Sequence, residues 1–197
     1  MSTVERSFRG ANLVWTGIIA ALAVIGVVSV AVTRLMIAFG PAGVVWQVAI
    51  PESYDSPSAP SGASVQVTQG IVAVTDASAG LVSLMVMTVL VSALSGIAAI
   101  ACYVVLTAEI SRGRTFSRRA IRMLTWMAAI VLLGTVACYL LDSAIGRGVR
   151  AAVGLGEVGG STPLSYWMGF AIFGALSLIA YAFRRGAALE KETEGLV

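Results

Sequence analysis

The sequence predicts an all-α membrane protein: a bundle of four transmembrane helices with a small extracytoplasmic β-hairpin-like element in the first outer loop. Composition is the first observation behind this prediction. Hydrophobic residues make up 58% of the 197 residues, charged residues only 12%, and the mean hydropathy is +0.91, whereas a soluble chain carries about a quarter charged residues. The apolar residues also gather in four long uncharged windows. An ordinary soluble domain is therefore excluded.

Each uncharged window is long enough to cross a bilayer, for which a helix needs roughly 20 residues. A charge at the middle of a span costs about 2.5–3.5 kcal/mol on the insertion scale, which explains why the windows contain no Asp, Glu, Lys or Arg. A fifth uncharged stretch, residues 35–51, is too short and is broken by Gly40, Pro41 and Gly43. The four windows are residues 10–33, 77–108, 123–141 and 158–183.

These windows divide the chain into nine segments. The first apolar run is longer than the about 7–15 residues of a signal-peptide core, so we expect an uncleaved first helix. We expect a cytoplasmic N-terminal tail at 1–9, transmembrane helices at 10–39, 80–108, 123–141 and 163–183, extracytoplasmic loops at 40–79 and 142–162, a basic cytoplasmic loop at 109–122 and a cytoplasmic C-terminal tail at 184–197.

The basic residues predict the orientation. With the N-terminus inside, ten of the thirteen lysines and arginines lie on the cytoplasmic side, and only Arg34, Arg147 and Arg150 lie outside. Cytoplasmic loops of membrane proteins carry this excess of positive charge. Both termini are therefore expected in the cytoplasm.

The first outer loop contains two β-rich runs, at residues 44–50 and 65–74, separated by a linker rich in Pro, Ser and Ala. Their composition and partial alternation are typical of short strands. Because two strands alone are marginally stable, we expect them to pack on the second outer loop, residues 142–162, or on a second copy of the protein. The chain does not decide whether the strands pair within one copy or between copies.

The cytoplasmic loop between the second and third helices is strongly basic. Ser117 is a good N-cap for the third helix, and Phe116 and Ile121 have the spacing of a hydrophobic staple. The positive-inside bias alone explains the charge, but the loop is also a candidate contact surface for anionic lipid or an acidic cytoplasmic protein. Its five candidate contact residues are Arg112, Arg114, Arg118, Arg119 and Arg122.

The segment G-R-T-F-S at residues 113–117, followed by Arg122 and Leu124, resembles the Gly-x-x-Phe-Ser/Thr segment of a bacterial family of small four-helix integral membrane proteins of unknown function. The resemblance implies a multi-pass protein of the bacterial plasma (inner) membrane with no assigned activity. Members of that family are often encoded beside small helix-turn-helix regulators, which implies a regulatory or stress-related role. No catalytic residue is carried over.

The remaining polar residues predict little chemistry. Arg34 and Asp142 end the first and third spans at the outer surface and form a candidate structural pair, of the kind that contributes little when exposed. Cys102 and Cys138 differ in depth by about 14 Å at helical rise, too far for a disulfide. Gly154 begins a GxGxxG sequence that lacks the βαβ setting of a dinucleotide site.

Taken as a whole, the chain predicts a non-enzymatic membrane protein with a sensory, regulatory or accessory role. It has no histidine, the commonest general base and metal ligand, and we expect no catalytic, cofactor-binding or metal-binding residues. The expected partners are the lipid bilayer, a candidate second copy of the protein, and anionic lipid or an acidic cytoplasmic protein at the basic loop. We expect no direct binding of nucleic acid. The alternative is a small oligomeric transporter or channel component, which needs polar groups inside the spans.

Overall fold

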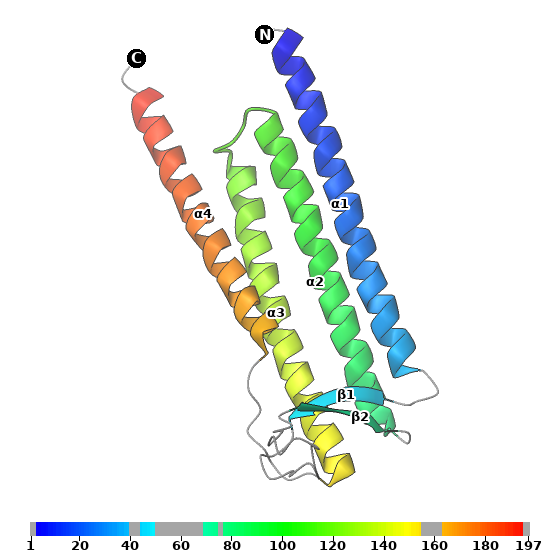
Figure 1. The fold of residues 1–197 in the computed structure, drawn as a ribbon. Helices are drawn as coiled ribbons and strands as arrows, with labels where there is room; N and C mark the ends of the chain where they lie inside the picture. The colour runs from blue at the N-terminus through cyan, green and yellow to red at the C-terminus, as the bar shows by residue number, and fades with distance from the viewer. Residues whose placement is uncertain (1–2, 40–43, 50–68, 75–76, 155–162, 195–197) are drawn as a thin grey trace, which may run out of the picture.

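The computed structural model of the protein describes residues 3–39, 44–49, 69–74, 77–154 and 163–194. These residues form four long helices and one two-stranded sheet (Figure 1). The elements are α1 (Thr3–Ala38), β1 (Val44–Ala49), β2 (Gln69–Val74), α2 (Ala79–Ser111), α3 (Arg118–Val153) and α4 (Leu164–Glu194).

The helices run alternately up and down, so the described ends of the chain and the α2–α3 loop lie together at one end of the molecule, the loop end (Figure 1). The two strands lie at the opposite end, the hairpin end. The most extensive packing joins α2 to α3, while α1 packs against α2 and α4 packs against α3. Among the described elements α4 has no comparable packing on α1 or α2. The helices therefore pack in chain order as an open row.

All four helices are long and apolar enough to cross a membrane. The candidate spans are Val14–Ile37, Ala79–Ser111, Arg118–Ala152 and Leu164–Leu189. Large apolar side chains cover their outer faces; Leu133 and Leu178, for example, are 67% and 71% exposed. Such faces would be costly in water, whereas lipid tails are as apolar as leucine. The predicted four-helix membrane architecture is confirmed.

Helix α3 is longer than the third uncharged window predicts. It begins at Arg118 and ends only at Val153, where Gly154 closes it with a left-handed backbone (φ 73°). The segment 142–153 is thus helical and not part of an outer loop. The uncharged window ends at Asp142 because Asp142 is charged. A transmembrane helix can continue past such a residue when the charged side chain faces a water-filled cavity. The other two glycines of the GxGxxG sequence lie outside the described residues.

The α2–α3 loop is closed at both ends by hydrogen bonds. At the end of α2, Gly113 N–H donates to the Ile110 carbonyl (2.9 Å) and Arg114 N–H to the Glu109 carbonyl (3.1 Å), which is the Schellman motif. The left-handed conformation that this motif requires is supplied by Gly113 (φ 74°). At the start of α3, the Ser117 hydroxyl accepts from Ala120 N–H (3.1 Å). The loop backbone is therefore fixed by its own sequence.

The strands β1 and β2 pair antiparallel, in a register that sets Val44 opposite Val74 and Ala49 opposite Gln69. Residues 50 and 65–68, the remainder of the predicted strands, lie outside the described residues. Trp46 and Val74 pack against a buried cluster that contains Leu81 and Ile145. The hairpin thus packs on the last turns of α3, within the segment expected to support it, although that segment is helix and not loop.

Glycines set the closest approaches between helices. A Cβ at Gly134 of α3 would lie 2.8 Å from Cβ of Ser95 on α2, and one at Gly169 of α4 would lie 2.8 Å from Cγ2 of Thr135 on α3. Small residues permit such contacts in membranes, where packing replaces the hydrophobic driving force. At Gly174, by contrast, an added Cβ would meet nothing within 4 Å.

Replacing Gly134 or Gly169 with Ala should therefore destabilise the protein by about 1–3 kcal/mol, the usual cost of overpacking. Thermal unfolding in detergent measures the effect, with Gly174→Ala as the matched control, which should keep or raise the unfolding temperature because alanine favours the helix. Equal unfolding temperatures for all three variants would contradict the close packing of α3 with α2 and α4.

Candidate functional site

A large cavity at the hairpin end is the main candidate site. Its volume is about 1050 Å³, and residues from all four helices and from β1 line it. This volume lies at the upper limit of the roughly 300–1,000 Å³ typical of ligand pockets. On α3 its lining runs from Val131 to Arg150, roughly 28 Å at helical rise. The cavity is therefore long and lies along the helices.

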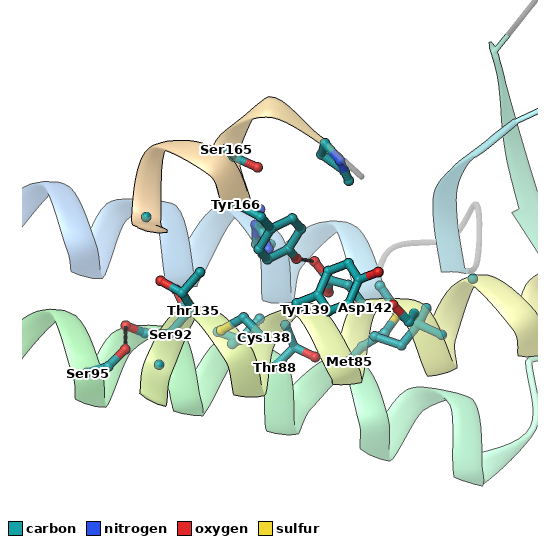
Figure 2. A pocket seen from close by; sticks show the side chains of 18 of the residues that line it. Met85, Thr88, Ser92, Ser95, Thr135, Cys138, Tyr139, Asp142, Ser165 and Tyr166 are labelled. Atoms are coloured by element: carbon teal, nitrogen blue, oxygen red, sulfur yellow. Dashed lines mark hydrogen bonds between the residues drawn. The ribbon is translucent and has the colours of Figure 1, made fainter. Parts of the chain in front are cut away.

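Asp142 and Tyr166 meet in this cavity. Asp142 projects from α3, and the Tyr166 hydroxyl of α4 donates a hydrogen bond to its Oδ2 (Figure 2). The ring of Tyr139 packs edge-on against that of Tyr166, with 5.3 Å between the centroids. The other carboxylate oxygen, Asp142 Oδ1, is buried and has no hydrogen-bond partner among the residues that the structure describes. A buried acceptor without a donor costs free energy, so this oxygen is suited to a ligand that supplies one.

Three arginines line the same cavity: Arg34 from α1 and Arg147 and Arg150 from α3. Arg34 and Asp142 line the same cavity, but no Arg34 nitrogen lies within 4 Å of an Asp142 oxygen. The expected direct pair at the outer surface is thus replaced by a shared cavity, in which Tyr166 is the hydrogen-bond partner of Asp142. Three positive charges against one carboxylate make this cavity electropositive.

Hydroxyl groups line the deeper part of the cavity. Ser95 donates to the carbonyls of Val91 (2.7 Å) and Ser92 (3.0 Å), and Thr88 donates to the carbonyl of Leu84 (3.0 Å). Figure 2 shows Thr88, Ser92 and Ser95 following α2 away from Asp142. Because Ser95 and Thr88 donate their hydroxyl protons to carbonyls of their own helix, they need no further acceptor in the cavity. The apolar side chains of Val131 and Ile172 line the same region.

The basic loop is the second candidate site. Its five arginines are all exposed, and their role as a contact surface stays a prediction. Glu109 is buried, with 5% of its side chain exposed, and pairs with Arg119 (3.5 Å) and Arg112 (3.6 Å). Among the described residues Arg114, Arg118 and Arg122 have no ion pair, so they are the arginines whose charge is left for a partner.

Phe116 packs on α4. Its ring lies edge-on to Phe183, with 5.7 Å between centroids, and it occupies the space that a Cβ at Gly186 would need. The staple between Phe116 and Ile121 stays a prediction. The three specific residues of the Gly-x-x-Phe-Ser segment thus have separate roles in the structure: Gly113 ends α2, Phe116 holds α4 and Ser117 begins α3.

Two cysteines are the remaining residues with reactive side chains in the described part of the chain, and one of them, Cys138, lines the cavity. Cys102 and Cys138 are both free. In the part of the chain that the structure describes, no group of three or more His, Cys, Asp or Glu residues is placed to hold a metal ion.

Comparisons with protein-family models, with curated proteins and with solved structures gave no match to this chain. Fold and helix length alone define the class, a multi-pass membrane protein with four candidate spans.

Sequence reasoning did not find the cavity. The sequence places Asp142 at the end of a span and assigns Tyr166 no role. The available signal is Tyr139, which precedes Asp142 by less than one helical turn, whereas Tyr166 is 24 residues away along the chain. Their proximity depends on how α4 lies against α3, which no local pattern contains.

Replacing Tyr166 with Phe should destabilise the protein by about 1–2 kcal/mol, near the upper end for hydrogen bonds in membrane proteins, because both Asp142 oxygens then lack a donor. The control is Tyr181→Phe, since Tyr181 lies on the same helix and is 62% exposed. Thermal unfolding in detergent compares the two; a Tyr166→Phe variant as stable as the control would contradict this contact.

Proposed function

We propose that the protein is a non-enzymatic, multi-pass membrane protein with a sensory, regulatory or accessory role, which binds a ligand at the hairpin end and contacts a partner at the loop end. The observation that carries this proposal is the position of α4. Near its start Tyr166 bonds to Asp142 in the cavity, and near its end Phe183 and Gly186 contact Phe116 of the basic loop.

Helix α4 can therefore transmit a change from one site to the other. Helix α4 packs on α3 and has no comparable packing on α1 or α2. A ligand that alters the Asp142–Tyr166 contact can therefore change the tilt of α4 without breaking extensive contacts to other helices. Small shifts of a packed helix are a common means of coupling two sites. At the loop end, such a shift moves Phe183 against Phe116, which adjoins the helix cap and the exposed arginines.

The loop end is proposed to face the cytoplasm of a bacterium, with the protein in the plasma (inner) membrane. Both termini then lie inside. The loop end bears Arg184 and Arg185 besides the five loop arginines, while Arg34, Arg147 and Arg150 lie toward the hairpin end, which agrees with the positive-inside bias. The exposed arginines at the loop end suit an acidic protein or anionic lipid.

A reporter that is fluorescent only in the cytoplasm, fused after Val197, should be active, and the same reporter inserted between residues 57 and 58 should be inactive. The expected pattern follows from the positive-inside bias, which puts the C-terminus in the cytoplasm, and from the three candidate spans between the two positions. A periplasm-specific reporter at the same two positions is the matched control. The opposite pattern would overturn the proposed orientation.

Limited proteolysis with trypsin tests coupling between the cavity and the α2–α3 loop. Trypsin cleaves after arginine, so its cleavage rate reports how often this loop opens. Tyr166→Phe should change the cleavage rate after Arg114 and Arg118 by about threefold or more, since even 0.7 kcal/mol of altered loop opening gives this factor. The contact that changes is at the other end of α4, so a change in rate requires transmission along that helix.

The control for the cleavage experiment is again Tyr181→Phe, which should cleave at the wild-type rate. Phe116→Ala should make cleavage insensitive to Tyr166→Phe, because it removes the aromatic contact between α4 and the loop. Wild-type cleavage rates in Tyr166→Phe would contradict coupling between the two sites.

The alternative, a small oligomeric transporter or channel component, is favoured by one observation. Asp142 lies within a candidate span and lines the cavity, whereas the four uncharged windows contain no such group. Solute uptake by proteoliposomes that Tyr166→Phe abolishes and Tyr181→Phe preserves would favour this alternative over a sensory role.

A further inference from the structure

We infer that the ligand of the hairpin-end cavity is a phospholipid whose headgroup carries both a phosphate and a hydrogen-bond donor. This inference rests on the proposed ligand-binding role of the cavity and names the class of ligand. Three features of the lining carry it: a change of polarity along its length, the arrangement of charges at one end, and exposed apolar walls.

The polarity of the lining changes along α3. Its charged residues, Asp142, Arg147 and Arg150, all lie toward the hairpin end, whereas Val131, Gly134 and Thr135 lie deeper along the helix. Arg34 joins the charged group from the last turns of α1. A cavity that is charged at one end and mostly apolar over the remaining length matches an amphiphile, with the headgroup at the hairpin end and the chains toward the middle of the membrane.

The charged end contains partners for both parts of such a headgroup. Arginine side chains bind phosphate through several N–H donors, and Arg34, Arg147 and Arg150 provide three of them. Asp142 Oδ1 is an acceptor without a partner in the described part of the chain, and an ammonium or hydroxyl group of the headgroup can donate to it after a small side-chain rearrangement. Phosphatidylethanolamine has such a donor, whereas phosphatidylcholine carries a quaternary ammonium without one.

The apolar walls are open to the surroundings. Met168 and Ile172 of α4 line the cavity although they are 59% and 50% exposed, and Ile37 of α1 lines it with 47% exposed. In a membrane, such exposed side chains face lipid. Since α4 packs mainly on α3, a lipid can enter sideways along α4 and keep its chains in contact with the bilayer.

The experiment measures lipids retained by the purified protein. The full chain is stripped of lipid in detergent, incubated with equal amounts of phosphatidylethanolamine and phosphatidylcholine with the same acyl chains, and reisolated; bound lipids are quantified by mass spectrometry. The wild type should retain about tenfold more phosphatidylethanolamine, the factor that one well-placed charge-assisted contact supplies. Equal retention of the two lipids would overturn the inference.

Two variants separate the roles of the charges. Arg34→Gln with Arg147→Gln should lower retention of both lipids, because each has a phosphate. Asp142→Asn should lower the preference for phosphatidylethanolamine and leave phosphatidylcholine unchanged. The charge-matched control, Arg184→Gln with Arg185→Gln at the loop end, should behave as the wild type; an equal loss in this control would show general surface attraction and overturn the inference.

Folding of each variant is checked by size-exclusion chromatography and thermal unfolding. If the double variant does not fold, Arg147→Gln alone, at an exposed residue, should lower retention of both lipids. Inorganic phosphate is the remaining probe: thermal stabilisation by phosphate equal to that by lipid would assign the arginines to a free anion and overturn the lipid inference.

Failure here is distinguishable from failure of the proposed function. If lipid selectivity is absent but Tyr166→Phe still alters cleavage of the α2–α3 loop, coupling between the two ends stands with another ligand. If lipid selectivity is present but cleavage is unaffected, the cavity is a lipid site that does not signal through α4.

Discussion

The hydrogen bond from Tyr166 to Asp142 joins α4 to α3 at the hairpin end, and the shape of the cavity depends on it. Farther along α4, Gly169 lies against Thr135, and at the loop end Phe183 lies against Phe116. These contacts hold one side of α4 against α3 along the length of the helix. Among the described elements, the other side of α4 has no packing of similar extent. The cavity is the space that this one-sided attachment leaves beside α1 and α2.

The polar groups that line the cavity between these apolar helices carry a cost in free energy, which the structure limits in two ways. The serine and threonine hydroxyls of α2 donate to carbonyls of their own helix, so they need no other acceptor. The charged residues gather where the helices approach the hairpin end, and long arginine side chains there can reach water or headgroups. Asp142 Oδ1 is the exception among the described side chains, since it is buried without a partner.

The helices were predictable because lipid removes water as a partner for the backbone, so any spanning segment must satisfy its own hydrogen bonds and be apolar over its length. The Ser117 cap was also predictable, since it depends on residues close in sequence. The Schellman motif at Gly113 has a local origin as well, but Gly113 enters the sequence analysis only through a family resemblance, and no helix end is predicted from it. The extension of α3 past Asp142 and the meeting of Asp142 with Tyr166 depend on how separate helices pack, which composition and charge windows do not record.

The doubly capped loop between α2 and α3 has a consequence for the arginines that it carries. The loop backbone is hydrogen-bonded to the end of α2 and to the start of α3. Glu109 forms ion pairs with two of the arginines, Arg112 and Arg119. Arg114, Arg118 and Arg122 therefore extend from anchored positions and not from a loose tether. A surface of this kind discriminates by the spacing of negative groups on whatever approaches it, and two partners of equal total charge would be bound differently.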